Sequence, residues 1–113
     1  MYRIQATYAP PGPGEPLCFD KDYYLNHHMP LSNKGLKDHV HILRADVAFD
    51  VRTVRGNQDL RSPCVYTLYV RELGDVEAFR AFLESPHVAP LRADVSNFTN
   101  LRVEWTFAEV FEG

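Results

Sequence analysis

The amino-acid sequence predicts an α+β fold in which strands and helices follow one another in the order β-α-β-β-α-β. Three observations lead to this expectation: alternating apolar residues near both chain ends, two segments with helical apolar spacing, and turn-forming residues between them. This order is that of the ferredoxin-like fold, a four-stranded antiparallel sheet with two helices on one face. At 113 residues, the chain is expected to form one domain, 1–113, around a modest core.

The strands are predicted by period-two alternation and by β-branched residues. In the first strand, Ile4, Ala6 and Tyr8 lie on one face, and polar residues lie on the other. The turn at 55–59 suits a hairpin connection between the second and third strands. The four strands are therefore expected at 2–9, 41–54, 65–71 and 103–111.

The first helix is expected to begin at Asp20, whose side chain can cap the unpaired N–H groups of the first turn. Phe19 precedes this cap and Tyr24 follows it by four residues, so the two are placed to form a hydrophobic staple. From Tyr24, the spacing i, i+4, i+7 predicts that His28 and Leu31 share its face.

Pro30 interrupts this helix because proline donates no backbone hydrogen bond and disfavours helical geometry at the preceding residue. Met29 is therefore expected outside the α region, with the helix kinking or stopping near His28 and resuming to about residue 38. Asp75 is expected to cap the second helix, which ends at Ser85-Pro86. A short helical turn and a loop are expected over 87–98.

A two-layer fold of this kind leaves one face of its sheet uncovered. The last strand is apolar on both faces, with Trp105 and Phe107 on one side and Ala108 and Val110 on the other. A second copy of the chain would cover the bare side, so we expect a symmetric homodimer. The alternative is a monomer whose uncovered face carries longer polar side chains.

Composition excludes several classes of protein. The net charge of −3 and the lack of a basic cluster argue against a nucleic-acid partner. No apolar run approaches the roughly 18 residues of a membrane-spanning helix, so no membrane partner is expected. The first residues resemble no signal peptide, and Cys18 and Cys64 are expected to be free thiols, so the expected location is cytoplasmic.

Two segments resemble the EthD family. Phe19-Asp20, then Tyr23-Tyr24 and His28-Met29-Pro30-Leu31, are similar to the signature of that family. The segment Asp94-Val95-Ser96-Asn97-Phe98-Thr99-Asn100 resembles its Asp-x-x-Asn-Phe-Thr element before the last strand. The resemblance extends from the first strand to the last.

The resemblance implies a dimeric α/β-barrel, in which two ferredoxin-like sheets pack back to back. The family takes its name from a protein needed for the breakdown of a fuel ether alongside an oxidising system. Proteins with the same barrel include cofactor-free monooxygenases, lactone isomerases, polyketide cyclases and haem enzymes. The fold alone therefore leaves the reaction open.

His28 is the candidate for a chemical role, because an imidazole can act as an acid or a base near neutral pH. The alternative is a structural histidine that hydrogen-bonds a carbonyl freed by Pro30. Tyr24 is the second catalytic candidate, able to steer a substrate oxygen or share a proton with His28; alternatively it is only the staple residue. Tyr8, Tyr69 and Trp105 are candidate substrate-binding residues if their strands bring them beneath the first helix. Otherwise they belong to the core or to a dimer interface.

The remaining polar residues suggest no cofactor. Asp94 and Asn97 are expected to close a turn through side-chain-to-backbone bonds. His39 and His41 share a strand face, but no third ligand completes a metal site. No glycine-rich phosphate loop or nucleophile motif is present, so neither metal nor other cofactor is expected.

These observations lead to two hypotheses of function, and a third interpretation is a purely structural dimer without a pocket. In the first, a small dimeric enzyme acts on a small apolar or aromatic carbonyl or phenolic compound in a degradative or secondary-metabolic pathway. The chemistry would be cofactor-free acid/base catalysis of the isomerase, cyclase, lyase or monooxygenase type. In the second, the chain is a non-catalytic ligand-binding or accessory protein of an oxidative degradation pathway. An enzyme should show His28 at a closed cavity with another polar group nearby, whereas a carrier may show His28 satisfied by backbone.

Overall fold

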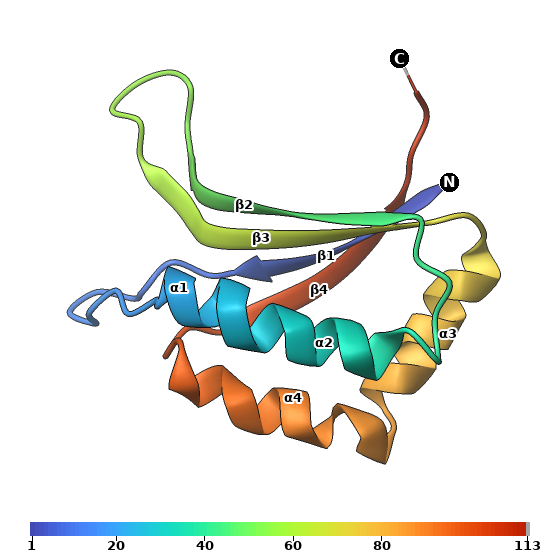
Figure 1. The fold of residues 1–113 in the computed structure, drawn as a ribbon. Helices are drawn as coiled ribbons and strands as arrows, with labels where there is room; N and C mark the ends of the chain where they lie inside the picture. Colours follow the sequence, from blue (N-terminus) through green and yellow to red (C-terminus); the bar gives the residue numbers. More distant parts are fainter. Residues whose placement is uncertain (113) are drawn as a thin grey trace.

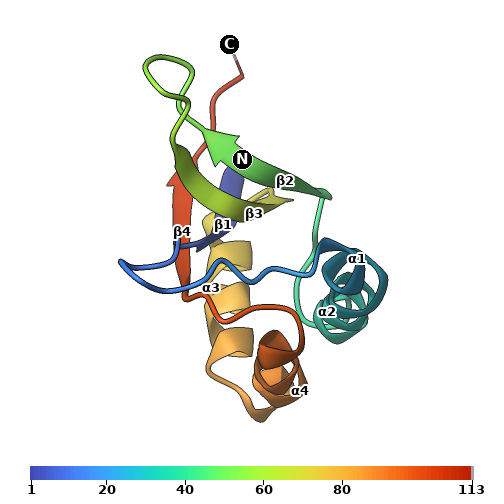
Figure 2. The same ribbon diagram turned by 90° about the vertical axis from the view of Figure 1, so that its left-hand side faces the viewer.

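The computed structural model describes residues 1–112, which form a four-stranded antiparallel sheet with helices on one of its faces (Figures 1 and 2). The order of strands in the sheet is β2-β3-β1-β4, so β3 and β1 are central and β2 and β4 are edges. The predicted α+β fold with its four-stranded antiparallel sheet is confirmed. The strands are β1 (Tyr2–Tyr8), β2 (Arg44–Arg52), β3 (Leu60–Val70) and β4 (Val103–Glu109).

Two helical runs lie below the sheet, the first between β1 and β2 and the second between β3 and β4. The first combines α1 (Lys21–Tyr23), the π-helical turn η1 (Tyr24–His28) and α2 (Met29–Leu36). Helix α3 (Leu73–Leu83) packs across the sheet near its β1–β4 side, and α4 (Ala89–Asp94) lies beside α2, farther from the sheet (Figure 2). The 3₁₀ turns η2 (Pro86–Val88) and η3 (Val95–Asn97) flank α4.

The segment that leads into β4 is more helical than the sequence predicted. A helical turn and a loop were expected over 87–98, but α4 and its two flanking turns fill most of this range. Pro86 and Pro90 lie in the first turns of η2 and α4, where proline costs no hydrogen bond and its fixed φ favours helix entry. Here the prolines start helices, and the expectation of a loop is wrong.

The predicted start of the first helix is confirmed. The carboxylate of Asp20 accepts a hydrogen bond of 3.0 Å from the backbone N–H of Tyr23. The rings of Phe19 and Tyr24 pack with their centroids 5.3 Å apart, as expected of a hydrophobic staple. This pairing fixes the angle at which the chain enters the helix.

Pro30 neither stops the helix nor displaces its neighbour from helical geometry. Met29 has φ −62° and ψ −46°, so the expectation that it leaves the α region is wrong. Its N–H donates to the carbonyl of Tyr24, five residues back, and thereby closes a π-helical turn immediately before the proline. The wider turn accommodates the proline ring, and the helix continues to Leu36.

The π-helical turn changes which side chains face the sheet. It contains an extra residue, so the buried face after His28 continues at Ser32 and Leu36, which are 6% and 2% exposed. Leu31 is 36% exposed, and its predicted place on the face of Tyr24 and His28 is therefore wrong. A polar hydroxyl takes the inward position in place of leucine.

Two strand boundaries and one helix cap also differ from expectation. β2 begins at Arg44, so His39 and His41 precede the strand, and β3 extends back through Pro63 to Leu60. Asp50, opposite Pro63, has a positive φ of 56° beside a register shift between β2 and β3. The cap of α3 is Glu72; Asp75 belongs to the same capping box as its third helical residue.

The helix-facing side of the sheet carries the core in two clusters. The first lies under α2 and α3 and includes Tyr66 and Leu68 of β3. The second lies under η1 and includes Tyr8 and Tyr24. In the part of the chain that the structure describes, the opposite face of the sheet has no helix over it (Figure 2). Within residues 1–112, no helix has the length and apolar character needed to cross a membrane.

Candidate functional site

A cavity of about 150 Å³ lies between the two core clusters, with the helices on one side and the sheet on the other. Most of its wall is apolar. A cavity of about this volume holds a single aromatic ring. The lining side chains with polar atoms or large rings include Tyr8, Tyr24, His28, Ser32, Tyr66 and Trp105.

His28 comes from the end of the π-helical turn and is 7% exposed. Its ring stacks on that of Tyr24, with centroids 5.5 Å apart and planes 21° apart, and contacts Phe98 at 4.5 Å. Its Nδ1 atom is 2.9 Å from Oδ2 of Asp94, at the end of α4. The imidazole is therefore held on three sides while it contributes to the cavity wall.

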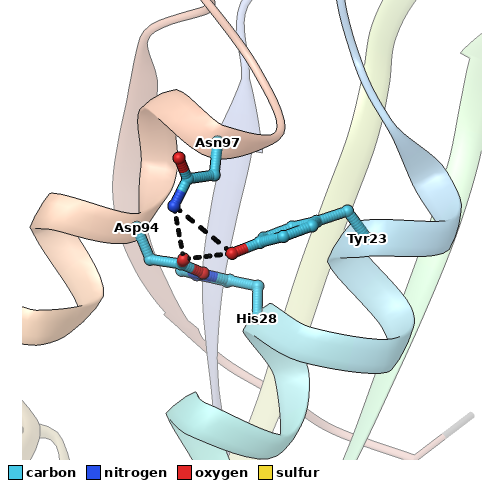
Figure 3. Close-up of polar contacts among 4 residues, drawn as sticks. All are labelled: Tyr23, His28, Asp94 and Asn97. Atoms are coloured by element: carbon cyan, nitrogen blue, oxygen red, sulfur yellow. Dashed lines mark hydrogen bonds and ion pairs between the residues drawn. The ribbon is translucent and has the colours of Figure 1, made fainter.

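Asp94 connects the two helical runs (Figure 3). Its Oδ1 atom accepts a hydrogen bond of 2.6 Å from the Tyr23 hydroxyl and one of 3.0 Å from Nδ2 of Asn97. The Asn97 amide also donates to the Tyr23 oxygen at 3.3 Å. With His28 on Oδ2, the carboxylate has a partner at each oxygen, and all of these partners are side chains.

These contacts define the charge of Asp94. Partial burial raises its pKa, but the hydrogen bonds from Tyr23, Asn97 and His28 outweigh burial, so the pKa lies below its usual value. The pKa of Tyr23 is raised, first by its hydrogen bond to this carboxylate. An ionised carboxylate only accepts hydrogen bonds, so Nδ1 of His28 must carry the proton it shares with Asp94. Nε2, across the ring, is then an available base in the neutral imidazole.

The aromatic hydroxyls beside His28 remain protonated over the physiological range. Burial raises the pKa of Tyr24 and of Tyr8 far above the usual tyrosine value, and the nearby Cys64 raises both further. Tyr8 also raises the pKa of Tyr24, whereas the hydrogen bond with Tyr24 partly lowers that of Tyr8. Burial also raises the pKa of the Cys64 thiol to about 12. This end of the cavity therefore offers neutral groups and no reactive thiolate.

The structure brings together four of the five residues that the sequence suggested as site residues. Tyr8, Tyr24, His28 and Trp105 line the cavity. Tyr69 lies on the other face of the sheet, where the guanidinium of Arg44 stacks 4.1 Å from its ring centre. The odd-numbered neighbours of Tyr66 and Leu68 on β3 point away from the helices, which explains this placement.

Sequence reasoning missed the roles of Tyr23 and Asp94. Asp94 and Asn97 do interact, but through their side chains and together with Tyr23, and the expected side-chain-to-backbone turn is not their arrangement. Their three-residue spacing was the available signal, and it was interpreted as a local turn. The partner residues lie 66 and 71 positions away, beyond the reach of local patterns.

No metal centre is visible in the part of the chain that the structure describes, where no three histidine, cysteine or acidic residues form a cluster. His39 and His41 do not share a strand face. The ring of His39 instead lies 4.7 Å from that of His87 and 5.3 Å from that of Phe82.

Residues 13–102 match the family model of the EthD domain. The chain belongs to the EthD family. The matched range contains both sequence segments that form the site, because the first supplies Tyr23, Tyr24 and His28 and the second supplies Asp94 and Asn97. No curated protein matches the sequence.

Solved structures with the same fold include other EthD proteins. An EthD-like protein from Ralstonia eutropha JMP134 superposes with a TM-score of 0.76 at 19% identity, over 96% of this chain and 89% of that one. An ethyl tert-butyl ether D family protein from Bacillus halodurans C-125 gives 0.58 at 17% identity, over 98% and 99%. HapK from Hahella chejuensis gives 0.56 at 17% identity, over 100% and 95%. At these identities the similarity establishes the fold.

Proposed function

We propose that this EthD-family protein binds a small apolar or aromatic carbonyl or phenolic compound in the cavity and moves a proton on it with His28. The chemistry would be acid/base catalysis without a cofactor, as in an isomerase, cyclase, lyase or monooxygenase of a degradative or secondary-metabolic pathway. One observation carries the proposal: a buried imidazole at the cavity wall has its Nδ1 bound to a carboxylate that two further side chains, Tyr23 and Asn97, hold in place.

In the proposed reaction, Nε2 of His28 takes a proton from a carbon next to a carbonyl group or from a phenolic hydroxyl. The imidazole becomes positively charged, and the Asp94 carboxylate, 2.9 Å from Nδ1, stabilises that charge. The substrate oxygen becomes negatively charged at the same time. Tyr24 is the donor proposed to hydrogen-bond that oxygen, since it lines the cavity and its raised pKa keeps its proton in place.

The apolar wall favours the same chemistry. Water-poor surroundings strengthen the attraction between the imidazolium and an enolate or phenolate. Away from Arg92, the charged arginine of the wall, they also favour a compound with little charge of its own, because a buried charge without a partner is costly. The volume of about 150 Å³ restricts it further to roughly one ring.

We also propose that the protein acts as a homodimer. Within residues 1–112, nothing covers the sheet face opposite the helices, and the β2–β3 loop and residues 110–112 both extend on that side (Figure 1). Val65 and Ala48 pair across β3 and β2 on this face and form an apolar centre among polar neighbours. Trp105 and Phe107 of β4 pair with Ala6 and Ile4 and face the helix side, so they do not belong to the uncovered face.

The proposed chemistry can be tested by deuterium exchange. Cyclohexanone is a one-ring carbon acid, and NMR in D₂O measures how fast its α-hydrogens exchange. The wild type should accelerate exchange, and His28→Asn should reduce the acceleration by roughly a hundredfold, because the amide retains a donor toward Asp94 but supplies no base. The matched control is His27→Asn, an exposed neighbour that should exchange like the wild type.

Equal exchange by wild type and His28→Asn would remove His28 from catalysis. A thermal-shift panel of phenolic, lactone and β-keto compounds separates binding from turnover, because any ligand of the native state raises the melting temperature. Stabilisation by such a compound without exchange would indicate the alternative, a non-catalytic ligand-binding protein.

A further inference from the structure

The wall of the cavity includes a tyrosine, Tyr66, whose hydroxyl the proposed proton chemistry does not use. Tyr66 of β3 is 3% exposed and lines the cavity, and its hydroxyl oxygen is sealed from bulk water. Among the buried side-chain polar atoms of residues 1–112, it is the one without a hydrogen-bond partner. A buried hydroxyl without a partner lowers the stability of the fold, so its presence in the cavity wall requires an explanation.

The surroundings of Tyr66 leave its proton available. Burial raises its pKa to about 12, so the hydroxyl keeps its proton at neutral pH, while the nearby Ser32 hydroxyl opposes that rise. The Tyr66 oxygen nevertheless has no hydrogen-bond partner among the residues that the structure describes. Ser32 therefore does not take up the Tyr66 proton.

Because Ser32 lies near the Tyr66 hydroxyl, its position on the helix relates that hydroxyl to His28. The two residues are one turn apart on the same buried face of the helix, a separation of about 6 Å along the axis. The π-helical turn produces this arrangement, because it moves Leu31 outward and Ser32 inward. The cavity thus has a base at one position and a pair of hydroxyls about one ring length away.

We infer that the compound bound in this cavity carries a hydrogen-bond acceptor, a second oxygen or nitrogen, that takes the proton of Tyr66 while His28 acts on the other end of the same ring. This inference rests on the proposed function, which it makes more specific. Tyr66 becomes the residue that distinguishes rings with an acceptor on the far side from rings without one. A site built to donate a hydrogen bond discriminates strongly against ligands that lack the acceptor.

Two phenols of nearly equal shape test the inference. 4-Hydroxybenzonitrile ends in a nitrogen acceptor, whereas 4-ethynylphenol ends in a carbon–hydrogen bond. Calorimetry should show that Tyr66→Phe weakens binding of the nitrile about fivefold to tenfold and changes binding of the alkyne by less than about twofold. The nitrile also makes its phenol more acidic, but this effect is common to both proteins and cancels in the comparison. Tyr69→Phe, on the other face of the same strand, is the matched control.

The stability of the ligand-free protein provides a second readout. If the Tyr66 proton has no partner, Tyr66→Phe should unfold at the same urea concentration as the wild type or a higher one. A clear fall would show that the hydroxyl is already bonded in the free protein and would overturn the inference. Unchanged nitrile binding by Tyr66→Phe would overturn this inference and leave the proposed function standing. Failure of both phenols to bind the wild type would overturn the proposed function as well.

Discussion

Asp94 receives hydrogen bonds from three side chains, and this arrangement determines which nitrogen of His28 carries a proton. Tyr23 and Asn97 both bind Oδ1, which leaves Oδ2 for the imidazole. Since Asp94 is ionised, its link to His28 fixes the Nδ1–H tautomer and the orientation of the ring. The aspartate is therefore a positioning residue, and its proposed effect on chemistry passes through His28.

Asp94→Asn should separate this positioning role from simple packing. An amide can rotate its NH₂ group toward Nδ1 and favour the opposite tautomer, with the proton on Nε2. We expect the cyclohexanone exchange rate to fall by roughly a hundredfold at neutral pH, with little change in the affinity for 4-hydroxybenzonitrile. Parallel losses in exchange and affinity would instead indicate a collapsed cavity.

The same substitution predicts a change in stability with pH. The pKa of Asp94 is lower in the folded protein than in the unfolded chain, so its carboxylate stabilises the fold above the unfolded pKa. This stabilisation is lost as pH falls below about 4 and through the folded pKa. Asp94→Asn should therefore flatten the acid side of the stability curve measured by urea unfolding. An unchanged acid slope would contradict the charge assigned to Asp94.

At this scale, local spacing identified part of the site. The four-residue spacing of Tyr24 and His28 was sufficient to predict that they share a helix face, and in the structure their rings stack. Asp94 was beyond this method, because its contact with His28 joins two helices that only the tertiary fold brings together. Tyr69 illustrates a second limit: alternation along a strand shows that two faces exist, but not which of them the helices cover.

At the scale of elements, the π-helical turn η1 links Pro30 to the site. Sequence reasoning identified the interruption correctly but not its form. A proline only removes a donor and adds a clash with the preceding turn, and the chain may end the helix or widen it. Here Tyr24 and His28 are both buried against the sheet, and widening lets the helix continue without exposing either of them.

Pro30→Ala should test whether this turn serves the site. Alanine restores the missing N–H and relieves the clash, so the helix can return to α-helical spacing. We expect the melting temperature to stay the same or rise, while exchange activity falls at least about tenfold because His28 and Ser32 rotate relative to Asp94 and Tyr66. Wild-type exchange in a more stable Pro30→Ala variant would show that the turn only accommodates the proline.

At the scale of the whole molecule, the order of elements was the most predictable property, because it depends only on where period-two and helical patterns alternate. Four strands and two main helical runs in this order leave few topologies with short, right-handed connections. The polarity of the uncovered sheet face was less predictable. Strand register places Gln5 beside Thr67, joined by a hydrogen bond of 3.2 Å, so much of that face is polar.

The proposed homodimer is tested on this face. Two chains of 13.0 kDa should elute together at about twice that mass in light scattering coupled to gel filtration. Val65 pairs with Thr7 and Ala48 at the apolar centre of the uncovered face. Val65→Glu would place like charges from both copies close together without compensation and should yield monomers. Leu31→Glu, on the exposed side of α2, adds the same charge away from the sheet and should leave the dimer intact. A wild-type monomer at tens of micromolar would contradict the proposal, and so would Val65→Glu dimers as stable as those of the control.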